Sequence, residues 1–241
     1  MSHLHAASPL LLVVMASCAA RTPGAQPHDM SIASHETTAA QETRAAGQHE
    51  QQFDPSAQLR RERCRTGGPA TAADVDTCWS SVTNATAEHL KQGEEHRARA
   101  ADHRAASQAL RDAEARTCVG IPAADRDESP FEHREDIEKV EPLYVRQGGK
   151  QSSERLEGAV VAFRAVPGMT APWLQRVVDC HLARNSALGH DVPEMAYCPL
   201  VPKGVTATVA PTRTGFAVEI RSGDSGTAKE ILRRAEGLRA R

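Results

Sequence analysis

The chain has 241 residues and a net charge of −2, with 40% hydrophobic but only 3% aromatic residues. Basic residues alternate with acidic ones and form no lysine-rich run, so the electrostatic signature of a nucleic-acid-binding protein is missing and we expect no such partner. Large apolar side chains dominate burial, and most of the aromatic residues lie at or after Phe131. We therefore expect the packed core in the C-terminal half.

Residues 1–17 have the pattern of a signal peptide. The apolar run from Leu10 to Val14 is far shorter than the roughly 20 residues that span a bilayer. It is followed by Met15 and two small residues, and then by Cys18. This pattern resembles the lipobox of bacterial lipoproteins, although Met15 stands where that class usually has leucine and no Lys or Arg precedes the apolar run. The resemblance implies that Cys18 is the lipidated first residue of the mature chain.

A lipidated Cys18 would be the membrane partner of the chain, and residues 18–30 would be the anchor and tether. The residue after the cysteine is Ala19. In lipoproteins of that class, an aspartate at this position would imply retention at the inner membrane. By analogy with that class, we expect an outer-membrane protein exposed to the periplasm or the cell surface. Cleaved secretion without lipid, and a cytosolic chain, are the alternatives.

Residues 31–121 predict an α-helical hairpin. The composition from Ser31 to Gln52 favours helix, and a second short helix is predicted over Leu59 to Cys64. Gly67-Gly68-Pro69 is a break. A long helix is then expected from Asp74 or Ser80 to Cys118. Because this helix has few large apolar residues, we expect it to pack against the first helix or to stand partly in solvent.

Residues 122–156 are rich in charged residues and proline and predict an irregular connector, whereas residues 157–241 predict a compact module. Thr170 and Pro172 mark the start of a helix with one apolar face. The order β-α-β-β-α predicts a small sandwich with helices on one face of a sheet, so the fold class is α+β. The order of elements is distantly similar to small periplasmic modules such as the BON domain. The expected elements are strands at 160–166, 204–209 and 216–220 and helices from 170 and over 226–238.

Five cysteines remain after Cys18, and an exported chain meets an oxidising compartment, so we expect disulfides. Cys180 lies on the predicted apolar-faced helix and Cys198 in the loop that follows, and we expect these two to pair. Cys64 could pair with Cys78 or with Cys118, and either bond leaves one thiol free. A site of Cys180, His181, His190 and Cys198 is a weaker alternative, because the spacing differs from the usual zinc patterns.

Histidines recur at seven-residue intervals in both predicted helices, and Glu42 continues the rhythm of the first helix. Seven residues make nearly two turns, so each set forms one stripe along its helix. Two turns rise about 10.5 Å, which prevents successive histidines of one helix from sharing an ion. The histidines are His28, His35 and His49 in the first helix and His89, His96 and His103 in the second.

An antiparallel partner helix would place the two stripes opposite each other at a similar pitch. That arrangement predicts a row of two-ligand sites suited to Zn²⁺ or Cu²⁺. The alternatives are a seam that packs without metal, a solvated face, and a seam that responds to pH near 6. No cofactor other than Zn or Cu is indicated.

Asp224 and Ser225 lie in a Gly-Asp-Ser-Gly sequence that resembles the nucleophile motif of chymotrypsin-like proteases. Here the sequence opens a predicted helix in a small module, where Asp224 and Ser225 fit as cap and turn residues. No phosphate-binding loop, nucleophile elbow or His-Glu-x-x-His motif is present. We therefore expect a non-enzymatic envelope lipoprotein, acting as an interaction or structural module with an envelope protein partner or binding a divalent metal.

Overall fold

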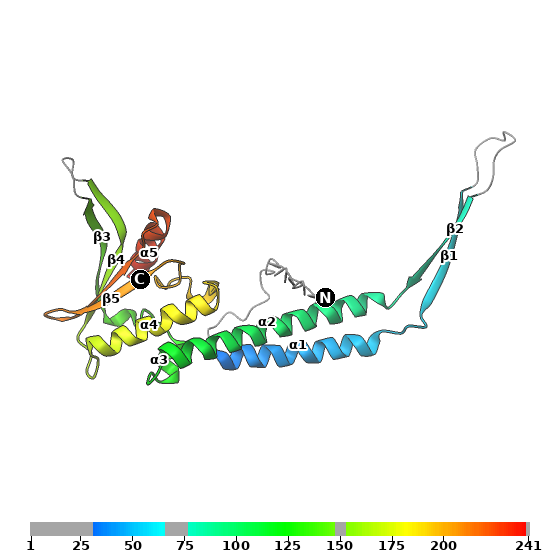
Figure 1. Cartoon of the computed structure of the whole chain (residues 1–241), viewed down its shortest axis with the longest axis horizontal. Helices are drawn as coiled ribbons and strands as arrows, with labels where there is room; N and C mark the ends of the chain where they lie inside the picture. Colours follow the sequence, from blue (N-terminus) through cyan, green and yellow to red (C-terminus); the bar gives the residue numbers. More distant parts are fainter. Residues whose placement is uncertain (1–30, 66–76, 148–152, 240–241) are drawn as a thin grey trace, which may run out of the picture.

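The computed structural model describes residues 31–65, 77–147 and 153–239. This part of the chain combines five α-helices with two antiparallel sheets, which confirms the predicted α+β class. Figure 1 shows a long arm that projects from a head formed by the C-terminal half. The predicted signal peptide, the lipidation site Cys18, the tether and His28 lie outside the described residues. No described helix is both long enough and apolar enough to cross a membrane.

Two antiparallel helices form the arm, α1 (Ile32–Gln52) and α2 (Ala87–Thr117). The Ser31 side chain caps α1 by accepting a hydrogen bond from the backbone N–H of Ser34. Small residues let the two backbones approach, and these are buried between the helices: Ala39, Ala46, Gly93 and Ala100. A Cβ added at Gly93 would lie 3.5 Å from the carbonyl oxygen of Ala46, so the helices are in close contact there.

A two-stranded ribbon, β1 (Gln58–Arg65) with β2 (Thr77–Asn84), extends the arm beyond the helices. The predicted helix over Leu59 to Cys64 is therefore wrong, and α2 begins later than predicted because β2 precedes it. Pairing with β2 supplies backbone hydrogen bonds to β1, and a disulfide joins Cys64 to Cys78 where the two strands face each other. These long-range contacts override the helix propensity of the Leu-Arg-Arg-Glu segment.

Hydrogen bonds fix the ribbon to the end of the helical pair. The backbone N–H of Asp54 donates to Thr86 Oγ1 over 2.9 Å, and Asn84 Nδ2 donates to the Asp54 carbonyl over 2.8 Å. The N–H of Ala85 also donates to the carbonyl of Ala57. The ribbon therefore continues the arm rather than hanging from it by a linker.

The head contains a four-stranded antiparallel sheet in the order β3-β4-β6-β5. Its strands are β3 (Ile137–Gln147), β4 (Ser153–Arg164), β5 (Thr206–Pro211) and β6 (Gly215–Arg221). The predicted irregular connector over 122–156 is wrong, because it contains α3 (Ala123–Asp127), a 3₁₀ turn (Arg134–Asp136), β3 and the start of β4. β3 is an edge strand, which tolerates the charged residues that made it look irregular.

One face of the sheet is covered by α4 (Ala171–Ala187) and α5 (Ser225–Gly237), and a short 3₁₀ turn (Pro193–Met195) lies in the loop after α4. Thr170 and Asp224 cap α4 and α5 through their side chains, as predicted. Apart from Ala106 and Leu110 of α2, the residues of the main buried cluster lie at or after Phe131, which confirms that the core lies in the C-terminal half. Its centre is made by Val161, Val218 and Ile220.

The root of the arm is fixed to the head by a disulfide between Cys118, at the end of α2, and Cys180 on α4. The predicted Cys180–Cys198 bond is therefore wrong, and Cys198 is a free, buried thiol. Its sulfur lies 3.2 Å from Ser129 Oγ, and burial raises the pKa of the Cys198 thiol, which leaves it protonated. The physical reason for the error is that α2 ends against α4, and this brings Cys118 closer to Cys180 than the following loop brings Cys198.

A buried ion-pair network lies beside this disulfide. Arg184 on α4 is fully buried, with Nη1 3.1 Å from Glu114 Oε1 and Nη2 2.8 Å from Asp127 Oδ1. Glu114 also accepts a hydrogen bond from Arg126 Nη1 over 2.5 Å. The network therefore joins α2, α3 and α4 at the point where the arm meets the head.

Candidate functional site

The predicted histidine stripes face each other along the contact between α1 and α2. His35 lies opposite His103, Glu42 opposite His96, and His49 opposite His89. Each step of seven residues along α1 matches a step of seven residues back along α2, so the two stripes stay in contact along the helical pair. We call these six residues the histidine seam.

Two pairs of imidazoles are in direct contact within the seam. The Nδ1 atoms of His49 and His89 are 3.2 Å apart, and those of His35 and His103 are 3.4 Å apart. His49 also stacks on His96, with ring centroids 5.2 Å apart. His35 and His103 are buried, whereas the other members are partly exposed. Solvent therefore reaches the end of the seam nearest the ribbon.

The middle layer of the seam is an ionic cluster. Glu42 Oε2 lies 2.7 Å from His96 Nδ1 and 2.8 Å from Arg99 Nε. Burial raises the pKa of Glu42, but the hydrogen bonds from His96 and Arg99 outweigh it, and the pKa of Glu42 lies below its ordinary value. Burial lowers the pKa of His103. The seam therefore combines an ionised carboxylate in its middle layer with a neutral imidazole in its buried layer.

The spacing of the paired nitrogens matches an edge of a tetrahedral metal site. Two nitrogens bound to Zn²⁺ at about 2.0–2.1 Å with a tetrahedral angle are separated by about 3.3 Å. The His49–His89 and His35–His103 distances are 3.2 Å and 3.4 Å. Each pair could supply two ligands, as the sequence predicted. No seam layer in the described residues brings three ligand atoms within 4.8 Å of one another.

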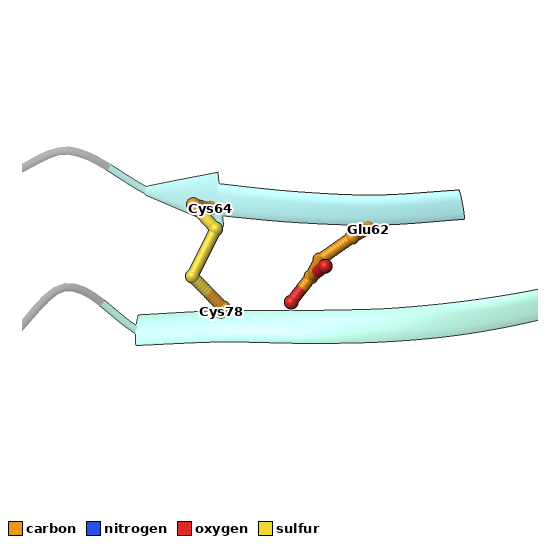
Figure 2. Close-up of side chains that lie close together, drawn as sticks. All are labelled: Glu62, Cys64 and Cys78. Atoms are coloured by element: carbon orange, nitrogen blue, oxygen red, sulfur yellow. A yellow bond between two sulfur atoms is a disulfide. The ribbon is translucent and has the colours of Figure 1, made fainter. Parts of the chain in front are cut away.

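Three potential metal ligands do come together on the ribbon. The ligand atoms of Glu62, Cys64 and Cys78 all lie within 4.8 Å of one another. Figure 2 shows that the two sulfurs form the disulfide that bridges the strands, with the Glu62 side chain beside it. Thiolates, not disulfide sulfurs, are the metal ligands that cysteine provides. In this oxidised state the group is a cross-strand link and not a metal site.

The ribbon carries apolar side chains that nothing in the described chain covers. Leu59, Trp79 and Val82 are 52%, 51% and 61% exposed. Arg61 and Arg63 are exposed on the same strand as Leu59. A two-stranded ribbon has no core of its own and is marginally stable in water, so the Cys64–Cys78 disulfide has a clear stabilising role.

The head contains a cavity of about 350 Å³ between α3, the end of β4 and the first turns of α4. Its walls are mainly apolar, and its polar groups are acidic side chains, Ser129 and His133. These polar side chains are not arranged as a catalytic nucleophile in contact with a base and a group that orients the base. The lining residues are Ala124, Asp125, Glu128, Ser129, Pro130, His133, Asp136, Phe163, Val166, Met169, Trp173, Leu174 and Val177.

His181 and His190, part of the weaker zinc alternative, are used structurally. His181 is fully buried on α4, and its Nε2 lies 3.1 Å from the carbonyl oxygen of Asp125. Burial lowers the pKa of His181 to about 4. His190 Nδ1 lies 2.9 Å from the Val201 carbonyl oxygen, and Cys180 is already bonded to Cys118. These residues therefore do not assemble into a metal site.

Sequence reasoning missed three features: the ribbon surface around Trp79, the head cavity, and the Arg184 network. A signal for the ribbon was present, because Cys64 and Cys78 flank the Gly-Gly-Pro break, as the paired residues of a hairpin flank its turn. No sequence signal distinguishes Arg184 from the other arginines. Comparison with protein-family models, with curated protein sequences and with solved structures finds no match to this chain.

Proposed function

We propose that the protein is a non-enzymatic, lipid-anchored protein of the outer membrane whose arm presents the β1–β2 ribbon to an envelope partner. The observation that carries the proposal is the exposure of Leu59, Trp79 and Val82 on a ribbon that covers no core of its own. Exposed apolar residues grouped with arginines are typical of recognition surfaces, in which tryptophan and arginine supply much of the binding energy.

The form of the arm supports this role. The 31 residues of α2 extend about 46 Å, and the 8 residues of β1 add about 26 Å. α1 begins at Ile32, at the root, whereas the ribbon lies at the far end of the arm (Figure 1). Lipid on Cys18 would therefore attach near the root, through residues 18–30, and leave the ribbon free to reach a partner away from the anchor.

The proposal is tested by placing a photoreactive amino acid at position 79 of the full-length protein in living cells. We expect crosslinked adducts at this position because Trp79 lies on the surface proposed to touch the partner. The matched control replaces Ala101, which is exposed in the middle of α2. Equal adducts at both positions, or none at position 79, would overturn the proposal.

A second candidate function is divalent metal binding at the histidine seam, favoured by the 3.2 Å separation of the His49 and His89 nitrogens. This pair is partly exposed, so an ion can reach it, and His96 stacks against His49 as a third imidazole. A layer with two histidines suits Zn²⁺ or Cu²⁺ at modest affinity.

Calorimetric titration with Zn²⁺ tests this candidate. We expect His49→Ala/His89→Ala to weaken binding at least tenfold, because both ligands of the layer are removed. His133→Ala is the control, because His133 is an exposed histidine of the head outside the seam. If the double variant and the control bind Zn²⁺ equally, the seam is a packing feature only.

A further inference from the structure

One face of the ribbon is both apolar and cationic. In the β1–β2 register Arg63 faces Trp79, and Arg61 and Leu59 follow at alternate positions of β1. Alternate strand residues point to the same face, so these four side chains lie together. Glu62 is on the opposite face, beside the disulfide. The Trp79 face therefore presents two positive charges and no acidic residue among its described side chains.

The head cavity has the complementary chemistry. Phe163, Met169 and Trp173 are among its walls, and Asp125 and Glu128 are among its lining residues. Neither of these carboxylates forms an ion pair with a described residue, whereas Asp136 of the same cavity is paired with Arg164. The cavity is therefore apolar inside, with two carboxylates whose charge is not neutralised.

We propose that the Trp79 face of one copy docks in the head cavity of a second copy. A cavity of about 350 Å³ has room for an indole side chain, and Arg61 and Arg63 would pair with Asp125 and Glu128. This inference rests on the proposed function of the ribbon as a recognition surface, and it names the partner as another copy of this chain.

The position of the two surfaces determines the kind of assembly. The ribbon is at one end of the molecule, and α3 and the start of α4, which line the cavity, are at the other (Figure 1). A ribbon therefore cannot reach the cavity of its own chain. The contact is heterologous, so each bound copy offers a new ribbon or a new cavity, and the copies build an open row or a closed ring.

A charge-swap experiment tests the proposal on the full-length protein in detergent, with mass measured by analytical ultracentrifugation over a range of concentrations. We expect the protein to self-associate, and Trp79→Ala to weaken association at least tenfold. Arg61→Glu/Arg63→Glu and Asp125→Lys/Glu128→Lys should each fail to associate alone. An equimolar mixture of the two should associate again, because each reversed ribbon meets a reversed cavity.

All four charge substitutions fall on exposed or partly exposed side chains, so we expect folding to be preserved, and far-UV circular dichroism checks it. A mixture that stays monomeric while both variants are folded would overturn the proposal. A wild-type protein that is monomeric at all concentrations would also overturn it. In that case the ribbon would remain a recognition surface, and only the identity of its partner would change.

Discussion

Arg184→Ala is expected to lower the free energy of unfolding by about 3–5 kcal/mol, because it breaks a buried ion pair by removing one partner. The Arg184 side chain is 0% exposed, and that of Glu114 is 11% exposed. Without the guanidinium, the largely buried Glu114 carboxylate loses one of its two arginine partners and keeps only Arg126. Urea denaturation followed by circular dichroism measures the loss.

The matched control is Arg176→Ala, which removes an exposed arginine two turns earlier on α4. We expect it to change the unfolding free energy by less than about 0.5 kcal/mol. The double variant Arg184→Met/Glu114→Gln should recover part of the loss, since position 114 then carries no charge and the glutamine oxygen can still accept the hydrogen bond from Arg126. A loss below about 1 kcal/mol in Arg184→Ala would show that the network does not hold the arm to the head.

Stability is expected to fall by about 3 kcal/mol as the pH is lowered from about 6.5 to 4, because of His181. Burial lowers the pKa of His181 from 6.5 to about 4, so the unfolded chain takes up a proton in this window that the folded chain does not. His103 acts in the same direction, because burial lowers its pKa too. The stabilisation is therefore complete above pH 6.5 and is lost toward pH 4.

His181→Gln tests the assignment, since glutamine stays neutral and retains an amide that can replace the hydrogen bond to Asp125. The unfolding free energy of this variant, measured in urea from pH 7 to 4.5, should depend less on pH than that of the wild type. His133→Gln is the control and should leave the slope unchanged, because His133 is exposed. Equal slopes in wild type and His181→Gln would contradict the account.

The helical pair was predictable because its signal is periodic. Histidines spaced by seven in two segments predict two stripes that face each other in an antiparallel pair, whereas the pairing of His35 with His103 and of His49 with His89 depends on the register of the helices. The caps at Thr170 and Asp224 were also predictable, since a cap depends on a few neighbouring residues. Local and periodic signals were sufficient for these elements.

The ribbon and the cysteine pairing were not predictable in the same way. The Leu-Arg-Arg-Glu segment of β1 has high helix propensity, and it becomes a strand only because β2 lies beside it and Cys78 is bonded to Cys64. The bond between Cys118 and Cys180 depends on where α2 ends against α4. These outcomes depend on contacts between distant segments, which residue spacing does not report.

The head cavity illustrates the same limit for the candidate site. Its lining comes from α3, the end of β4 and α4, which are separated along the chain. The cavity exists only once α3 and the segment after it have packed against the end of β4 and the first turns of α4. Trp79 and the cavity could therefore be recognised as complementary only in the folded chain.

The most direct test of the ribbon as the recognition surface is its removal from the full-length protein. Residues 55–85 are replaced by a short Gly-Ser loop, and the size of the native complex extracted in mild detergent is compared with that of the wild type. We predict that helical content and melting temperature are nearly unchanged, because the buried cluster begins at Ala106, and that the complex is lost. A complex of unchanged size without the ribbon would contradict the account.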